Sequence, residues 1–137
     1  MWWWYALLSA VFAALTAVLA KVGIKGVNSD LATAIRTVVI LVVAWGIVLA
    51  KDNPADIWHL SPRTWVFLGL SGGATGLSWI FYFKALQLGK VSQVAPVDKL
   101  SVAIAIALSV LFLGETLTLK AALGAALIIG GTLVLIL

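Results

Sequence analysis

Long apolar runs separated by short polar segments fill most of the chain. The runs cover residues 2–24, 31–50, 64–88, 92–113 and 119–137. Because about 20 apolar residues in a helix span the hydrocarbon core of a bilayer, each run predicts a transmembrane helix. The runs are continuous rather than alternating, and a membrane barrel needs many more of them. The pattern therefore predicts an all-α membrane protein with five transmembrane helices in one domain, residues 1–137.

Residues that favour helix ends lie at the borders of these runs. We expect Ser29 or Asp30 to cap the second helix at its N-terminus, and Ser61 followed by Pro62 to start the third. Glycine tolerates the left-handed backbone conformation that often ends a helix. We therefore expect glycines to end the first, third and fourth helices, and these are Gly26, Gly89 and Gly114.

The first run starts with an aromatic block and lacks the marks of a signal peptide. Trp2, Trp3, Trp4 and Tyr5 stand where an interfacial aromatic belt is expected. A cleaved signal peptide has a basic start and a shorter apolar core. We therefore expect this run to be a transmembrane helix.

The number of spans is odd, and this bears on assembly. Many secondary transporters consist of two halves related by a two-fold axis in the membrane plane, so a second copy inserted upside down would complete such an inverted repeat. Lys and Arg near the helix ends set orientation. The two faces carry nearly equal numbers, with Lys21, Lys25, Lys84 and Lys90 on one face and Lys51, Arg63 and Lys120 on the other. This balance leaves open a single orientation or dual topology.

Composition agrees with a membrane protein and removes several function classes. The chain is 64% hydrophobic and 10% charged, whereas soluble domains have about 25% charged residues. It has no cysteine, which excludes disulfides and thiolate metal sites, and its net charge of +4 includes no basic run suited to nucleic acid. His59 lies near Asp56 in a polar loop, which fits a solvated side chain better than a metal ligand. We expect no metal, no cofactor and no nucleic-acid partner.

Three charged residues lie well inside predicted spans: Arg36, Asp98 and Lys99. A charge at the centre of a membrane helix costs about 3 kcal/mol or more, so such residues indicate function. Arg36 and Asp98 both lie roughly 9 Å below the same face, which leaves open a structural bridge between them. Lys99 either faces a cavity or extends its chain to the surface. Pro96 frees a backbone carbonyl one turn back, which favours a polar pocket there, although a harmless first-turn proline is also consistent.

A second candidate set lies on the third helix. Thr75, Ser78, Trp79 and Tyr82 share one face at helical spacing. Hydroxyls beside large aromatic rings suit a ligand that is partly polar and partly apolar. A helix-packing face explains the same pattern equally well. With Arg36 and Lys99, these four residues are the candidate substrate-binding set.

The last helix has the composition of an association helix. Small residues let membrane helices approach closely. The candidate dimer interface consists of Ala122, Gly124, Ala126, Gly130 and Gly131. The chain shows no nucleophile–base pair and no phosphate-binding loop, so we do not expect an enzyme.

Three motifs and one arginine resemble the EamA domain of the drug/metabolite transporter superfamily. The motifs are Ala-Leu-x-x-Gly at residues 85–89, Ser-x-Val-Ala-Pro at 92–96 and Leu-Gly-Glu-x-Leu-Thr at 113–118, and the arginine is Arg36 in Ala-Ile-Arg at 34–36. The resemblance covers essentially the whole chain. Larger members of that family carry two five-helix domains in tandem and in inverted orientation, so a chain with one domain implies a dimer. The last helix also resembles the dimerising helix of small multidrug resistance proteins, whose acidic residue in the first helix has no counterpart here.

The resemblance and the buried charges together indicate a secondary transporter. We expect an antiparallel homodimer in the cytoplasmic (inner) membrane, moving a small metabolite or drug-like solute by alternating access, with Asp98 as the candidate proton-coupling residue. The alternative is a non-transporting membrane subunit or a component of a lipid-carrier flippase. The sequence leaves the charge of the solute open, because the basic residues favour an anionic or zwitterionic solute whereas Trp79 and Tyr82 favour a cationic or aromatic one.

Overall fold

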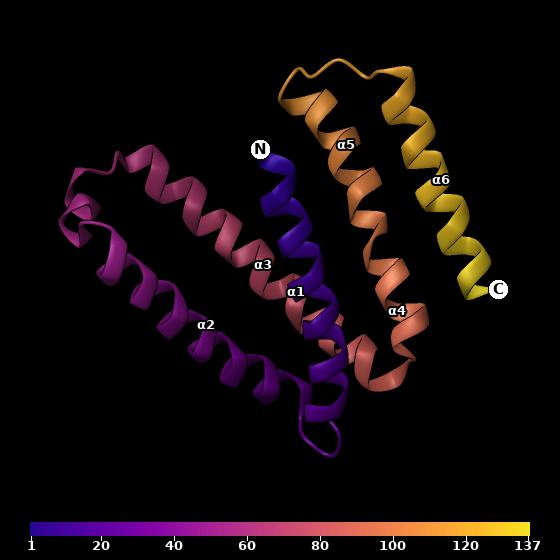
Figure 1. Cartoon of the computed structure of the whole chain (residues 1–137), viewed down its shortest axis with the longest axis horizontal. Coiled ribbons are helices and arrows are strands. Elements are labelled where there is room, and N and C mark those ends of the chain that lie inside the picture. The colour runs from indigo at the N-terminus through magenta and orange to yellow at the C-terminus, as the bar shows by residue number, and fades with distance from the viewer. The chain divides into compact units, whose positions relative to one another are not determined.

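The computed structural model describes residues 1–137 and contains helices but no strands (Figure 1). The elements are α1 (Trp2–Gly23), α2 (Ser29–Lys51), the 3₁₀ helix η1 (Pro54–His59), α3 (Pro62–Leu88), α4 (Val91–Asp98), α5 (Leu100–Phe112) and α6 (Leu119–Ile136). Five helical segments are long and apolar enough to cross a membrane, with α4 and α5 together forming the fourth, Val91–Phe112. The prediction of an all-α protein with five spans is confirmed.

The chain divides into two compact units. Unit 1 comprises residues 1–19 and 88–137, and unit 2 comprises residues 20–87. In unit 1, α6 packs against α4 and α5. Unit 2 contains the end of α1, all of α2 and η1, and nearly all of α3. That residues 1–137 form a single domain stays a prediction.

Most of the predicted helix ends are correct, with two exceptions. Gly26 and Gly114 have φ angles of +70° and +69°, the left-handed conformation expected of them, whereas Gly89 directly follows the end of α3 without a positive φ. Ser61 Oγ accepts a hydrogen bond from Thr64 N at 3.2 Å, directly before Pro62 starts α3. The cap of α2 was wrongly predicted, because Asn28 rather than Ser29 or Asp30 caps it.

Asn28, Ser29 and Asp30 all have side chains that can cap a helix, and backbone geometry explains why Asn28 caps α2. Its backbone is extended, with φ −60° and ψ 127°, so its side chain turns back over the first turn of α2. The Asn28 Oδ1 atom accepts from Asp30 N at 2.9 Å and from Leu31 N at 3.1 Å. Ser29 is instead the first helical residue and is buried.

Unit 2 has a small core where the end of α1 meets the end of α3. Ile24, Phe83 and Leu86 are its fully buried large side chains. Two polar side chains connect the same helix ends, since Lys21 Nζ donates to the carbonyl of Leu86 and Gln87 Nε2 donates to the carbonyl of Ile24 at 3.0 Å. These bonds satisfy backbone carbonyls that the end of α1 and the end of α3 leave without helical partners.

The fourth span is broken, which the apolar pattern did not reveal. Proline lacks an N–H and its ring crowds the preceding turn, so Pro96 leaves the carbonyl of Ser92 without its usual helical partner. The amide of Lys99 is shared between the carbonyls of Ala95 (3.2 Å) and Pro96 (3.1 Å), and α4 ends at Asp98 while α5 starts at Leu100. Thr132 on α6 is buried and donates to the Pro96 carbonyl at 3.1 Å. The predicted single helix over 92–113 is therefore two helices that share one span.

Little of the apolar surface is covered by the chain itself. At most 11% of any span is buried. Every helix that could cross a membrane has large apolar side chains that are exposed. A surface of this kind matches surroundings of lipid or of a second membrane protein, because neither requires polar groups on the helix faces.

Candidate functional site

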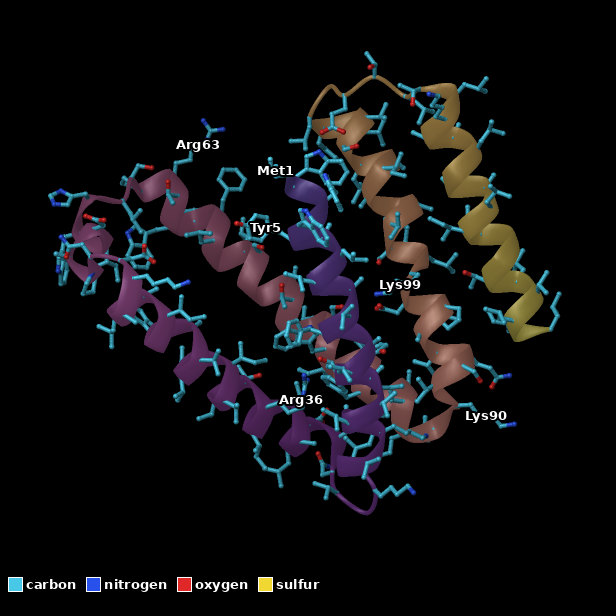
Figure 2. The ribbon with its side chains drawn as sticks, viewed as in Figure 1. Met1, Tyr5, Arg36, Arg63, Lys90 and Lys99 are labelled. Carbon is cyan, nitrogen blue, oxygen red and sulfur yellow. The ribbon has the colours of Figure 1, made fainter.

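Arg36 lies on α2 (Figure 2), and its guanidinium lies over aromatic rings of α3, both within unit 2. Its guanidinium carbon lies 4.1 Å from the centroid of the Phe83 ring and 5.7 Å from that of Trp79. Phe83 is only 1% exposed, so the ring under the charge is fixed in the core. One turn before Arg36 on α2, Thr33 is also buried and bonds back to the carbonyl of Ser29 at 2.9 Å. Arg36 thus follows a buried turn at the start of α2.

The guanidinium of Arg36 keeps an unused donor. Its Nη1 atom is buried and has no hydrogen-bond partner. A guanidinium has five N–H donors and no acceptor, and an unsatisfied buried polar group costs about 1–3 kcal/mol, more when it is charged. Attraction between a cation and ring faces offsets part of that cost, about 0.5–2 kcal/mol. The aromatic rings thus stabilise the guanidinium in part, while its Nη1 donor has no hydrogen-bond partner.

The candidate residues on α3 differ in their relation to this charge. Trp79 contacts the guanidinium of Arg36, and Tyr82 packs edge-on against Phe83 with ring centroids 5.4 Å apart. Thr75 and Ser78 are exposed, and the hydroxyl of Thr75 donates to the carbonyl of Ser71 at 3.0 Å. The structure therefore joins Arg36 to Trp79 directly and to Tyr82 through Phe83, but shows no such link for Thr75 or Ser78.

Sequence reasoning missed Phe83, which lies closest to the charge. It stands four residues after Trp79, which is the same-face spacing of a helix. That spacing was a usable signal, although a phenylalanine in an apolar run is equally suited to lipid or to the core. The choice depends on which face of α3 meets α2, which the sequence of α3 alone does not specify.

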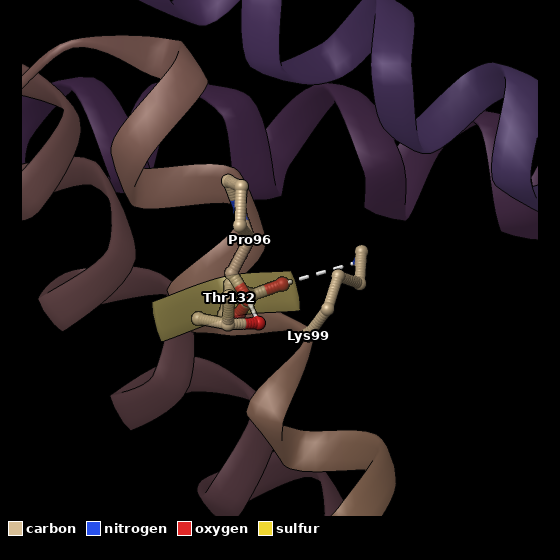
Figure 3. Close-up of polar contacts among 4 residues, drawn as sticks. Pro96, Lys99 and Thr132 are labelled. Atoms are coloured by element: carbon tan, nitrogen blue, oxygen red, sulfur yellow. Dashed lines mark hydrogen bonds and ion pairs between the residues drawn. The ribbon is translucent and has the colours of Figure 1, made fainter. Parts of the chain in front are cut away.

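Asp98 and Lys99 form an ion pair at the break in the fourth span (Figure 3). Lys99 Nζ lies 3.2 Å from Asp98 Oδ2, and the two side chains are 57% and 33% exposed, respectively. The expectation that these neighbours point in different directions is wrong for their charged ends, because both side chains are flexible enough to meet. Both belong to unit 1, beside the bond from Thr132 to Pro96. The alternative bridge from Arg36 to Asp98 would join residues of the two units and stays a prediction.

The candidate interface on α6 is open to different degrees. Ala126, Gly130 and Gly131 are exposed, whereas Ala122 and Gly124 are half-buried. A Cβ atom added at Gly124, Gly130 or Gly131 would meet nothing within 4 Å. These glycines are therefore not required for packing inside the chain, and their role in a dimer stays a prediction.

A separate cavity of about 240 Å³ lies where η1 follows α2, lined by Trp45, Val48, Asp52, Asn53, Pro54, Asp56, Ile57 and Leu60. Its lining includes Asp56 but not the exposed His59. No group of three or more His, Cys, Asp or Glu side chains could hold a metal ion.

Comparison with known proteins defines the class and then the family. Five candidate spans are those of a multi-pass membrane protein, and the charged residues within them indicate a functional site. Residues 1–137 match the model of the EamA-like transporter family, so the chain belongs to that family, as the motifs predicted. Membership supports a membrane transporter rather than an enzyme.

Two relatives are similar in sequence. The "uncharacterized transporter in cobO 3′region" of a Sinorhizobium species is 55% identical over 134 residues, which are 98% of this chain and 95% of that protein. An uncharacterized protein of Methanocaldococcus jannaschii is 48% identical over 58 residues, 42% of each chain. No solved structure matches the chain.

Proposed function

We propose that this membrane transporter is a secondary transporter that moves a small metabolite or drug-like solute across the cytoplasmic membrane by alternating access. The observation that carries the proposal is the Nη1 atom of Arg36, a buried donor without a partner inside a membrane span. Charges inside membrane helices are retained where they meet a substrate or a water-filled pathway. Arg36 with Trp79, Phe83 and Tyr82 is the proposed solute site.

The broken fourth span supports the same proposal. Transporter binding sites are often built on discontinuous helices, whose interrupted backbone supplies polar groups at membrane depth. The break here places an acid and a base, Asp98 and Lys99, two and three residues after Pro96. We propose that protonation of Asp98 removes its ion pair with Lys99 and so couples solute movement to protons. Two states that differ in protonation are what coupling requires.

The proposed assembly is an antiparallel homodimer. Five spans need an inverted partner to complete the two-fold plan of such transporters. The Sinorhizobium relative supports this, because the matched 134 residues are 95% of it and leave no room for a second five-helix half. The exposed glycines of α6 offer a surface for close helix approach.

Reconstitution of the purified protein tests the function. A solute screen by thermal unfolding in detergent comes first, because a ligand that binds the folded state raises its melting temperature. Stabilising solutes are then tested for counterflow in liposomes that contain no other protein. We expect counterflow and a response to an imposed pH gradient. A stabilising solute that never crosses the liposome membrane would instead favour a non-transporting subunit or a flippase component.

Asp98→Asn isolates the coupling step. The variant should still bind solute and catalyse counterflow but no longer respond to the pH gradient. Asp52→Asn is the matched control, because Asp52 lies just after α2 and outside the spans. A pH response that survives in Asp98→Asn would remove the coupling role from this residue while leaving the transport function intact.

A further inference from the structure

We infer that the solute bound at Arg36 is a monovalent carboxylate attached to an apolar, aromatic-sized body. The inference rests on the proposed function in one respect: it takes the Arg36 site to be the solute site. Three observations lead to it, concerning the aromatic rings, the free donor and the surrounding hydroxyls.

The aromatic rings beside Arg36 are already occupied by a cation. Faces of Phe and Trp rings attract positive charge, and this alone would favour a cationic solute. The guanidinium of Arg36 itself lies over both rings, at 4.1 Å from the centroid of Phe83 and 5.7 Å from that of Trp79. A cationic solute would therefore meet a like charge rather than a free ring face.

The unpaired Nη1 donor of Arg36 favours binding of an anion, and no acidic side chain of unit 2 is bonded to it. A guanidinium binds a carboxylate through two parallel N–H bonds, a geometry that a neutral acceptor cannot match in strength. The acids of unit 2 are Asp30, Asp52 and Asp56. Asp30 is six residues from Arg36, roughly 9 Å along the helix, and the other two lie beyond the far end of α2. Nη1 of Arg36 accordingly has no partner.

The surroundings of Arg36 limit the rest of the solute. Thr33 and Thr37, one turn before it and directly after it on α2, donate their hydroxyls to their own helix at 2.9 and 2.8 Å. Their donors are thus not available for a sugar or another polyol. The guanidinium itself lies over the rings of Trp79 and Phe83, which are apolar surfaces. One guanidinium with apolar neighbours balances one negative charge on an apolar body, whereas a phosphate dianion would leave a second charge uncompensated.

The inference is tested with three probes of nearly one shape and different charge. Phenylacetate, phenylacetamide and phenethylammonium are titrated against the full chain in detergent, and the shift in melting temperature is followed. We expect phenylacetate to half-saturate at a concentration at least about tenfold below that of the other two, since a charge-assisted pair distinguishes it. Inorganic phosphate and phosphatidylserine micelles are run in parallel as other sources of anion.

Arginine variants locate the binding. Arg36→Gln should raise the half-saturating concentration of phenylacetate at least about tenfold. Arg36→Lys keeps the charge but loses the two parallel N–H donors. Its half-saturating concentration should lie between that of the wild type and that of Arg36→Gln. Arg63→Gln is the matched control and should change little, because Arg63 also lies over a phenylalanine, 5.6 Å from the Phe67 centroid, but is exposed at the start of α3.

Several outcomes overturn the inference. They are equal or tighter binding of phenethylammonium or phenylacetamide, no stabilisation by phenylacetate, tighter binding of phosphate or phosphatidylserine, and an Arg36→Gln variant that binds phenylacetate like the wild type. If Arg36→Gln does not fold, the probe preference of the wild type and the behaviour of Arg36→Lys decide. Arg36-dependent binding without counterflow of any solute would contradict the transport proposal alone. Counterflow of solutes without Arg36 dependence would contradict the carboxylate inference alone.

Discussion

Replacement of Thr132 by valine tests how the last helix is attached to the broken span. Thr132 is 4% exposed, and its hydroxyl is shared between the carbonyls of Ile128 on its own helix (2.8 Å) and Pro96 on α4 (3.1 Å). Valine keeps the size of the side chain and removes both bonds. Hydrogen bonds between membrane helices contribute about 0.6 kcal/mol on average and up to about 1.7 kcal/mol. We therefore expect the unfolding equilibrium to shift roughly 3-fold to 17-fold beyond the loss of the local bond.

Thr33→Val is the control, because it removes only a local bond within one helix. Thr33 is 5% exposed, and its hydroxyl bonds only within its own helix, to the carbonyl of Ser29. Unfolding in mixed micelles of increasing denaturing detergent is followed by the fluorescence of the seven tryptophans. The difference between the two variants reports the bond from α6 to α4. Equal destabilisation of the two variants would refute the view that Thr132 joins α6 to the break.

Three further predictions concern the turns and the assembly. Gly114→Ala should lower stability by about 1–2 kcal/mol because of its left-handed backbone at φ +69°, whereas Gly124→Ala, which has open space, should be neutral or stabilising in a melting experiment. Gly130→Leu should weaken the dimer measured by crosslinking, and Gly46→Leu, equally free of contacts inside the chain, should not; an unchanged dimer would move the interface away from α6. The chain has no cysteine, so His59→Cys gives a single label, which should react from both sides of the membrane if both orientations coexist; reaction from one side only would remove dual topology.

The sequence alone predicts those features of the fold that depend on neighbouring residues of the chain. The five spans follow from apolar length, and the left-handed turns at Gly26 and Gly114 follow from the missing Cβ atom. The start of α2 was less certain, because Asn28, Ser29 and Asp30 all have capping side chains and backbone geometry selects one of them. The break at Lys99 was missed because Pro96 near a helix start is compatible with an intact helix.

Prediction of the site depended on contacts between helices. Arg36, Asp98 and Lys99 could be selected from sequence, because a charge in an apolar run is conspicuous. The partner of each charge could not, since that depends on which faces of two helices meet. Phe83 cannot be told from the other apolar residues of α3 by sequence, because its role depends on the Arg36 side chain that reaches it from α2. Asp98 and Lys99 pair where α4 has ended and α5 has not yet started.

The contact between Arg36 and Phe83 bears on the empty return step of the proposed carrier cycle. A carrier completes its cycle either by returning empty or by exchanging one solute for another, and a bare charge in the membrane penalises the empty return. The ring of Phe83 lies 4.1 Å from the guanidinium carbon and belongs to the chain itself, so its contact with the charge does not depend on a ligand for its origin. In the carrier cycle proposed above, this ring would offset part of the cost of the unpaired charge during the empty return, by about 0.5–2 kcal/mol. On that proposal we expect net uptake and net efflux as well as exchange.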